Sequence, residues 1–201
     1  MFDVQPQRVE RESPSPRARF KTPWVPYPAV ARALKTMRDL IARPHEGRPL
    51  NLALIGAPNF GKSHLVDFFA DHYPDLPDRE IPQIQVLRID TLPRADGPAL
   101  VRELMREMGC RYIQRDPLDE LIQKFCVRAE PLEILMIIID EFSNGHWGRL
   151  EASQILIHAV RSISNRLRRP IMLAGTEKLE DVLRNDPQLS ERCIRNSDDT
   201  H

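Results

Sequence analysis

The sequence predicts an α/β protein in which helices cover both faces of a central parallel sheet. Short apolar runs rich in β-branched residues alternate with segments whose apolar residues recur at helical spacing, and strands separated in this way pair in parallel. A glycine-rich, phosphate-binding pattern directly follows the first run, and the most apolar run ends in two adjacent carboxylates. Together these observations predict a P-loop NTPase core.

Composition favours a single main domain. A chain of 201 residues can build one sizeable core but not two domains with linkers. Its 29 Lys and Arg residues balance its 29 Asp and Glu residues, so any surface that binds nucleic acid must be local. No apolar run approaches the roughly 18 residues that span a bilayer, and the N-terminus lacks the apolar part of a signal peptide. We therefore expect a soluble, cytoplasmic protein with no membrane partner.

Four segments are expected along the chain. Residues 1–21 mix charge with repeated proline and carry too little apolar surface to repay folding, which predicts a disordered tail. Residues 22–48 are expected to form a linker, in which aromatic residues lie between stiffening prolines, and a first helix. The core is expected over residues 49–192, and residues 193–201 form a short C-terminal tail.

Strands and helices alternate through the predicted core. The expected strands are Asn51–Ile55, Ile84–Asp90, Ile134–Ile139 and Pro170–Gly175. The expected helices are Ala29–Ala42, Lys62–His72, Ala99–Met108, Leu118–Val127, Leu150–Leu167 and Lys178–Leu183. Asp96 and Asp116 are predicted helix caps, because each precedes a proline that is preset for a first turn.

The pattern G-x-x-x-x-G-K-S is expected to bind phosphate. Gly56 and Gly61 leave room for backbone N–H groups to turn toward phosphate oxygens at the positive end of the following helix. Lys62 is expected to reach the β- and γ-phosphates, and the Ser63 hydroxyl to ligate Mg²⁺. The other residues expected to contact the cofactor along this stretch are Ala57, Pro58, Asn59, Phe60 and His64.

The run ILMIIIDEF places Asp140 and Glu141 at the carboxyl end of a central strand, where ligands of open α/β sheets bind. We expect Asp140 to hold Mg²⁺ and Glu141 to orient and deprotonate an attacking water. The alternative is an acidic pair that merely ends a buried strand. The phosphate-binding pattern upstream favours the catalytic interpretation.

Two further residues each fit two roles. Thr176, after the fourth strand, would either sense the γ-phosphate or cap the next helix. Arg192 would either reach a neighbouring subunit's nucleotide or remain a solvated surface arginine, and Arg195 is near enough in the chain to be the trans-acting arginine instead. The three cysteines, Cys110, Cys126 and Cys193, form no C-x-x-C pair, which predicts reduced thiols and no zinc site.

In chain order, the phosphate loop, the Asp-Glu strand, the Gly-Thr strand and the D-P-Q-L-x-x-R segment resemble an AAA+ ATPase. More narrowly, they are similar to the TniB family of transposition ATPases. That narrower resemblance rests on WVPYP, GAPNFGKSHLV, IIIDEF with the long stretch after it, and DPQLSER. It covers the chain from Thr22 to Arg192.

The resemblance implies an ATP-dependent regulator of DNA transposition in the bacterial cytosol. Such a protein would bind ATP and Mg²⁺, assemble on duplex DNA as a homo-oligomer, and recruit or stimulate a transposase together with other transposon proteins. It assigns Lys62, Glu141, Thr176 and Arg192 to catalysis, Arg192 acting in trans. It also places the segment with Tyr27 against the adenine, the alternative being simple packing of a linker.

The sequence departs from the family pattern at its C-terminal end. The chain stops soon after Arg192, so the helical lid expected of an AAA+ ATPase is largely absent, and Cys193 stands where the family tends to place an aromatic residue. A lid closes over nucleotide and helps to join subunits, so its absence predicts weak turnover, in a fragment or in a reduced member of the family. Two alternatives stay open: another AAA+ ATPase, such as a helicase-loader-like or clamp-loader-like protein, and a nucleotide-dependent scaffold without useful turnover.

DNA contact is expected from the segment after the Asp-Glu strand. The loop SNGHWGR carries His146 and Trp147 next to a basic residue. The basic positions on and around the long helix are Arg149, Arg161, Arg166, Arg168 and Arg169. In an oligomer they would line a channel around the phosphate backbone, whereas in a monomer they would solvate the helix and complement its dipole. For Arg161 and Arg166 the second interpretation is favoured.

Overall fold

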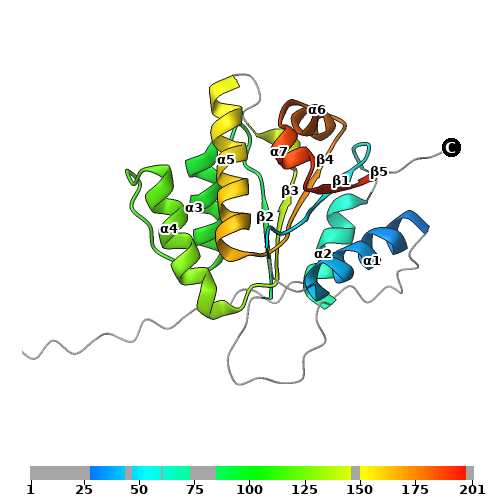
Figure 1. Ribbon diagram of the computed structural model, residues 1–201, viewed down its shortest axis with the longest axis horizontal. Helices are drawn as coiled ribbons and strands as arrows, with labels where there is room; N and C mark the ends of the chain where they lie inside the picture. Colours follow the sequence, from blue (N-terminus) through cyan, green and yellow to red (C-terminus); the bar gives the residue numbers. More distant parts are fainter. Residues whose placement is uncertain (1–27, 44–46, 60, 73–84, 146–149, 198–201) are drawn as a thin grey trace, which may run out of the picture.

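A computed structural model describes residues 28–43, 47–59, 61–72, 85–145 and 150–197 (Figure 1). Its helices are α1 (Pro28–Ala42), α2 (Lys62–His72), α3 (Gly97–Glu107), α4 (Leu118–Ala129), α5 (Leu150–Leu167), α6 (Lys178–Asn185) and α7 (Pro187–Ser190), with short 3₁₀ turns η1 (Glu130–Leu132) and η2 (Phe142–Asn144). Its strands are β1 (Asn51–Ile55), β2 (Val86–Asp90), β3 (Met136–Asp140), β4 (Ile171–Gly175) and β5 (Cys193–Ser197). Every predicted helix and strand is present, with ends that differ by a few residues.

The strands form one parallel sheet in the order β2-β3-β4-β1-β5. Helices α3, α4 and α5 cover one face, and α1 and α2 cover the other (Figure 1). Each central strand supplies both cores, since alternate residues point to opposite faces. In β3, Ile137 and Ile139 join the α3–α5 side, whereas Met136 and Ile138 join the α1–α2 side. The predicted architecture is thereby confirmed.

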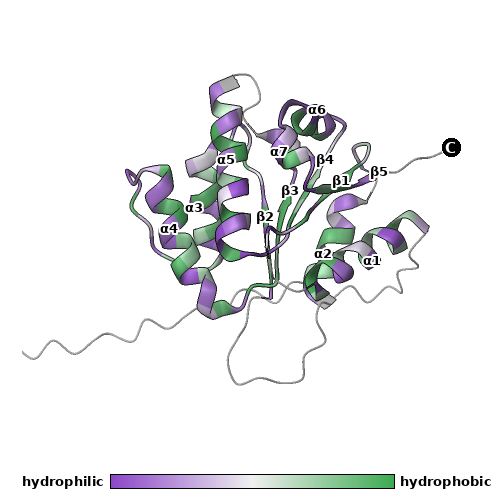
Figure 2. Ribbon diagram, viewed as in Figure 1, coloured by the Kyte–Doolittle hydropathy of each residue, from purple (hydrophilic) through white to green (hydrophobic). Residues whose placement is uncertain are grey.

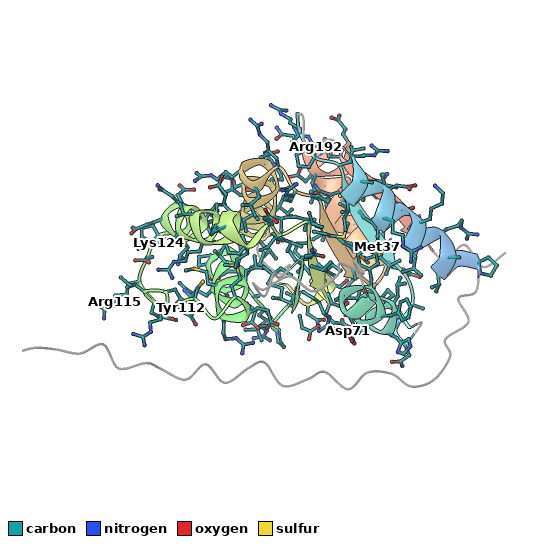
Figure 3. All side chains as sticks on the ribbon, turned by 90° about the horizontal axis from the view of Figure 1, so that it is seen from below. Met37, Asp71, Tyr112, Arg115, Lys124 and Arg192 are labelled. Atoms are coloured by element: carbon teal, nitrogen blue, oxygen red, sulfur yellow. The ribbon has the colours of Figure 1, made fainter. Side chains whose placement is uncertain are left out.

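Burial explains why the central strands are almost wholly apolar. All five residues of β1, β3 and β4 are buried, and β3 is coloured as largely hydrophobic in Figure 2. Helix α1 packs by one face only: Met37 is fully buried against the sheet (Figure 3), and the apolar residues around it have the helical spacing that the sequence predicted. None of the described helices is long and apolar enough to cross a bilayer.

Strand β5 differs from the expectation of a short tail after residue 192. It pairs in parallel with β1 from Asn51↔Cys193 to Ile55↔Ser197, and the Asn51 N–H donates to the Arg192 carbonyl at 2.6 Å. An edge strand pairs with one neighbour and is partly open to solvent, so CIRNS needs little apolar character to pair. Cys193 is its buried residue, and the sheet continues past the expected end of the core.

The two aspartates that were predicted as helix caps behave differently. Asp96 caps α3, since its Oδ1 accepts from the Ala99 N–H at 2.8 Å. Asp116 does not cap α4, whose N-cap position is Pro117 without a side-chain hydrogen bond. Asp116 instead pairs with Lys124 at 2.8 Å and raises the pKa of that lysine, together with Glu120. The second cap prediction was therefore wrong.

The cysteines are free thiols in the structure. Burial raises the pKa of Cys126 to about 11 and that of Cys193 to about 12. Both therefore stay protonated near neutral pH, where a thiol is a weak nucleophile and a poor metal ligand. No group of His, Cys, Asp and Glu suited to a metal ion occurs in the parts of the chain that are described.

Candidate active site

The candidate site lies at the carboxyl edge of three neighbouring strands. β1 leads into the phosphate loop, β3 ends at Asp140, and β4, which lies between them, ends before Thr176. The Gly56 N–H donates to the Gly175 carbonyl at 3.2 Å, which ties the start of the loop to the end of β4. Segments far apart in sequence thus meet where open α/β sheets bind ligands.

The phosphate loop turns sharply before α2. Asn59 and Gly61 both have positive φ, 63° and 77°, and a Cβ on Gly61 would meet nothing within 4 Å. Glycine is needed at that position for its backbone conformation rather than for space. The Gly61 carbonyl then accepts from Leu65 N–H at 2.9 Å and starts the helix. Phe60 lies outside the described residues, as does Tyr27.

Lys62 is held by its own loop. Its Nζ donates to the carbonyl of Gly56 at 2.9 Å and to that of Ala57 at 2.7 Å. These bonds keep the ammonium group on the inner side of the loop, close to the backbone that was predicted to surround phosphate. Pro58 is exposed beside them, and His64 is part of the first turn of α2.

Asp140 is a buried carboxylate at the end of β3. Its side chain is 1% exposed, and its Oδ1 accepts from the Glu141 N–H at 2.8 Å. Ser63 stands in the first turn of α2, which packs against β3 on the sheet face toward which Asp140 points. A carboxylate and a hydroxyl are hard oxygen donors of the kind that Mg²⁺ takes in proteins. The donor set therefore fits the predicted metal.

Glu141 adopts a conformation that is costly for a residue with a side chain. Its φ of 52° and ψ of 32° lie in the left-handed region, where strain of this kind gathers at functional sites. The turn is stabilised by the bond between the Asn144 N–H and the Glu141 carbonyl at 2.8 Å. Asn144 Nδ2 also approaches Glu141 Oε2 at 3.4 Å, and the glutamate stays half-buried beside Asp140.

Ser143 connects the turn after β3 with the end of β4. Its buried hydroxyl accepts from the Thr176 N–H at 2.7 Å. A Cβ on Gly175 would lie 2.3 Å from that hydroxyl, so glycine is required there for space. No local pattern indicated a role for Ser143, because its partner lies 33 residues away in the chain.

The helix-cap alternative for Thr176 finds no support in the structure. The N-cap of α6 is Glu177, which makes no side-chain cap bond, and Thr176 contributes its carbonyl to the Leu179 N–H at 2.8 Å. The position of Thr176 beside the loop fits the sensor role, which stays a prediction.

Arg192 lies at the amino-terminal ends of the strands, whereas the phosphate loop lies at their carboxyl ends. It directly precedes Cys193, which pairs with Asn51 at the beginning of β1, and its Nη1 donates to Asn165 Oδ1 at 3.2 Å. Figure 3 shows the arginine far from Tyr112 and Arg115 of the α3–α4 loop. Because Arg192 lies beside the first residue of β1 and the phosphate loop follows the last, the structure does not bring Arg192 together with the phosphate loop of its own chain.

The basic residues around α5 have separate surroundings. Arg161 pairs with Asp186 at 3.3 Å and also donates to Gln188, so it links α5 to α7. Arg166 and Arg169 border a cavity of about 320 Å³ beside Cys126, at the amino-terminal edge of β3 and β4 and away from the candidate site. Residues 146–149, with Trp147, lie outside the described residues.

Arg88 is a residue of the site that sequence reasoning missed. It lies in the middle of β2, 14% exposed, and its guanidinium approaches Asp140 Oδ2 at 3.4 Å. The available signal was a charged residue inside the otherwise apolar run IQVLRID. Such a residue needs a partner when the strand is covered.

Comparisons with known proteins identify the family. A family model described as bacterial TniB protein matches residues 19–196. No curated protein matched the chain.

Solved structures show the same fold in ORC and Cdc6 proteins. The ORC2 protein of Aeropyrum pernix, in ADPNP-ADP complexes, has a TM-score of 0.58 and 14% identity over 83% of this chain and 46% of that chain. Cdc6p of Pyrobaculum aerophilum has a TM-score of 0.57 and 17% identity over 87% and 48%. Drosophila ORC bound to AT-rich DNA and Cdc6 has a TM-score of 0.51 and 14% identity over 84% and 28%. This chain thus spans less than half the length of each. Since the family model covers most of the chain and the sheet with its helices superposes on these ATPases, the chain belongs to the TniB family and has the fold of an AAA+ P-loop ATPase.

Proposed function

We propose that this protein is an ATP-dependent regulator of DNA transposition. It binds ATP with Mg²⁺, hydrolyses ATP slowly, assembles on duplex DNA as a homo-oligomer, and recruits or stimulates a transposase. The observation that carries the proposal is the meeting of the phosphate loop with Asp140 and Glu141 at one sheet edge, tied by the Gly56–Gly175 hydrogen bond. Membership of a bacterial family supports the transposition context and a place in the bacterial cytosol.

Each residue of the site has a proposed task. The loop N–H groups and the Lys62 ammonium would bind phosphate oxygens, and Ser63 with Asp140 would hold Mg²⁺. The ion would neutralise charge that develops on the phosphates. Glu141 would orient a water and accept its proton on a carboxylate oxygen. Thr176 would contact the terminal phosphate from the end of β4.

DNA binding is proposed to accompany assembly of the ATP-bound form. The Drosophila structure that resembles this chain is bound to AT-rich DNA, which supports a nucleic-acid partner for the fold. Net charge is zero, so the contact must come from a local surface assembled in the oligomer, and residues 146–149 with nearby arginines are the candidates. Such contacts go mainly to phosphate and weaken with salt.

The proposal is tested by binding to a fluorescent random-sequence duplex with ATP, ADP or no nucleotide, at two salt concentrations. Wild-type protein should bind tightly only with ATP. Lys62→Ala should lower ATP affinity roughly tenfold or more, because loss of a charge-assisted phosphate contact costs about 1.5–3 kcal/mol. DNA binding that depends on ATP should disappear with it.

Lys35→Ala is the matched control, since Lys35 is an exposed lysine whose partner is Asp39 on the same helix, α1. It should behave as wild type. Equal DNA binding by Lys62→Ala with and without ATP, at the wild-type level, would refute the proposal. Phosphate release in the same samples separates turnover from the scaffold alternative, which predicts ATP-dependent binding without release. Pull-down with the cognate transposon proteins separates a transposition regulator from a helicase-loader-like ATPase.

A further inference from the structure

Arg88 lies among three carboxylates that come from three different elements. Its Nη1 and Nη2 contact both oxygens of Asp90, at 3.2 Å and 3.0 Å, in a two-pronged pair on β2 itself. Nη2 also approaches Asp140 Oδ2 on β3 at 3.4 Å. Nε lies 2.9 Å from Asp67 Oδ1 on α2, although its N–H points away from a hydrogen-bonding direction, so this contact is an ion pair. One cation therefore faces three anions.

The sheet pleat explains why these groups meet. Arg88 and Asp90 are two residues apart on β2, Asp140 pairs with Asp90 in the register, and all three side chains point to the face covered by α2. Asp67 follows Ser63 by four residues on α2, which places the two side chains on one side of that helix, one turn apart. Arg88 thus joins the two elements that carry the candidate metal ligands.

Burial makes the positive charge of Arg88 important for Asp140. Asp140 is 1% exposed, Asp67 is 34% exposed and Asp90 is 59% exposed, so water screens the last two carboxylates but not the first. A buried carboxylate is costly unless a cation or hydrogen bonds compensate it. Among the described residues, the Asp140 carboxylate contacts the Glu141 N–H and the Arg88 guanidinium. Removing Arg88 would leave three carboxylates without the cation between them.

We infer that Arg88 is the internal counter-cation of the candidate metal site, filling the electrostatic place beside Asp140 that a divalent cation takes up when it binds. Arg88 is a positioning residue: it keeps the end of β3 joined to α2 before metal and nucleotide arrive. The inference rests on the proposed function only in assigning Asp140 to the metal. Because a divalent cation and Arg88 neutralise the same negative charge, the inference predicts that Mg²⁺ stabilises the protein more when Arg88 is removed.

The test compares thermal stability of nucleotide-free protein in EDTA and in millimolar Mg²⁺, at constant ionic strength. Wild-type protein should hardly respond, since Arg88 already supplies the charge. In EDTA, Arg88→Met should melt at a lower temperature than wild type. Mg²⁺ should raise the melting temperature of this variant by about 3 °C or more, which for a chain of this size corresponds to about 1 kcal/mol in the free energy of unfolding. Arg88→Lys, which keeps the charge, should respond to Mg²⁺ as little as wild type does.

Arg106→Met is the matched control, because Arg106 pairs with a single carboxylate, Glu103, on the exposed surface of α3. Its melting temperature should not depend on Mg²⁺. A variant that is unfolded in EDTA is titrated with Mg²⁺ in the same way, and recovery of its helical circular dichroism counts as the expected rise. Failure of Mg²⁺ to stabilise or refold Arg88→Met would overturn the inference. Since no nucleotide is present, that outcome would leave ATP binding untouched, and loss of ATP binding in wild-type protein would leave this result standing.

Discussion

At the scale of single residues, Gly175 connects three parts of the candidate site. Its carbonyl accepts from the Gly56 N–H of the phosphate loop, and its missing side chain leaves room for the Ser143 hydroxyl. That hydroxyl in turn accepts from the Thr176 N–H at 2.7 Å. A change at any of these residues should therefore affect the turn after β3, the end of β4 and the loop together.

We predict that Gly175→Ala lowers the free energy of unfolding by about 1–3 kcal/mol, because the new Cβ overpacks the site. The Cβ would lie 2.3 Å from Ser143 Oγ, and the next neighbours would be 3.3 Å away. Ser143→Ala alone should also destabilise, since it leaves the Thr176 N–H without its acceptor. Combined with Gly175→Ala, however, it removes the clash.

The double variant should therefore lose less stability than the sum of the single variants, by about 1 kcal/mol or more. Urea unfolding of the four proteins measures this coupling. Ser164→Ala is the control, since Ser164 is another buried serine whose hydroxyl bonds to Asn51 and Arg169 instead. It should add to Gly175→Ala without coupling. Additivity in the Ser143 pair would show that the close approach at Gly175 is not the cause of its cost.

At the scale of secondary-structure elements, similar sequence signals lead to different structures. Asp96 and Asp116 each precede a proline and a helix, yet only Asp96 bonds a first-turn N–H. Asp116 is drawn to Lys124, eight residues along the chain on α4. Local sequence favours a helix cap at both aspartates. At Asp116 the ion pair with Lys124 takes the place of the cap hydrogen bond.

This difference predicts unequal effects of two otherwise matched substitutions. Asp96→Ala should lower the free energy of unfolding by about 1 kcal/mol, the usual loss for a helix cap. Asp116→Ala should have a smaller effect, because the pair it removes is only partly buried and Lys124, itself 35% exposed, keeps Glu120 as a partner at 2.6 Å. Denaturant unfolding at low and high salt distinguishes them, because salt weakens the ion pair more than the cap. A larger loss for Asp116→Ala would contradict the assignment.

At the scale of the whole molecule, the proposed catalytic groups occupy two opposite edges of the sheet. The phosphate loop follows β1, whereas Arg192 lies beside the first residue of β1. Five residues at roughly 3.3 Å each separate the two edges, a span too long for an arginine side chain. Arg192 therefore does not reach the phosphate loop of its own chain, which is what the proposed trans role requires.

A mixing experiment tests this arrangement. Lys62→Ala and Arg192→Ala should each lose ATP hydrolysis stimulated by DNA, the first by losing nucleotide and the second while still binding it. Mixed together, they should regain part of the activity, because some interfaces then join an intact loop to an intact arginine. Arg184→Ala is the control, since Arg184 is an exposed arginine of α6 that pairs with Glu180. Arg195→Ala is tested beside Arg192→Ala as the alternative trans-acting arginine. Mixtures no more active than their components would rule out a trans role for Arg192.

Much of the fold could be predicted because it depends on local patterns. The apolar runs located every described strand except β5, and helical periodicity located every described α-helix except the short α7. The glycine-lysine-serine pattern located the phosphate loop. Strand β5 was missed because an edge strand buries few side chains and leaves little trace in CIRNS. In the candidate site, the residues of the phosphate loop and the Asp-Glu pair were predicted from their motifs. Their meeting at the carboxyl ends of the strands follows from parallel pairing. Their catalytic roles stay predictions.

The sequence by itself determined the alternation of strands and helices, the phosphate loop and the acidic end of β3, because each of these depends on neighbouring residues. Only the tertiary structure decided that Arg88 meets Asp67, Asp90 and Asp140, that Ser143 fills the space beside Gly175, and that Arg192 faces away from its own loop. These contacts join residues distant in the chain, and strand order and register bring them together. Local propensity carries no information about such pairs, whose geometry comes from packing the sheet between its helices.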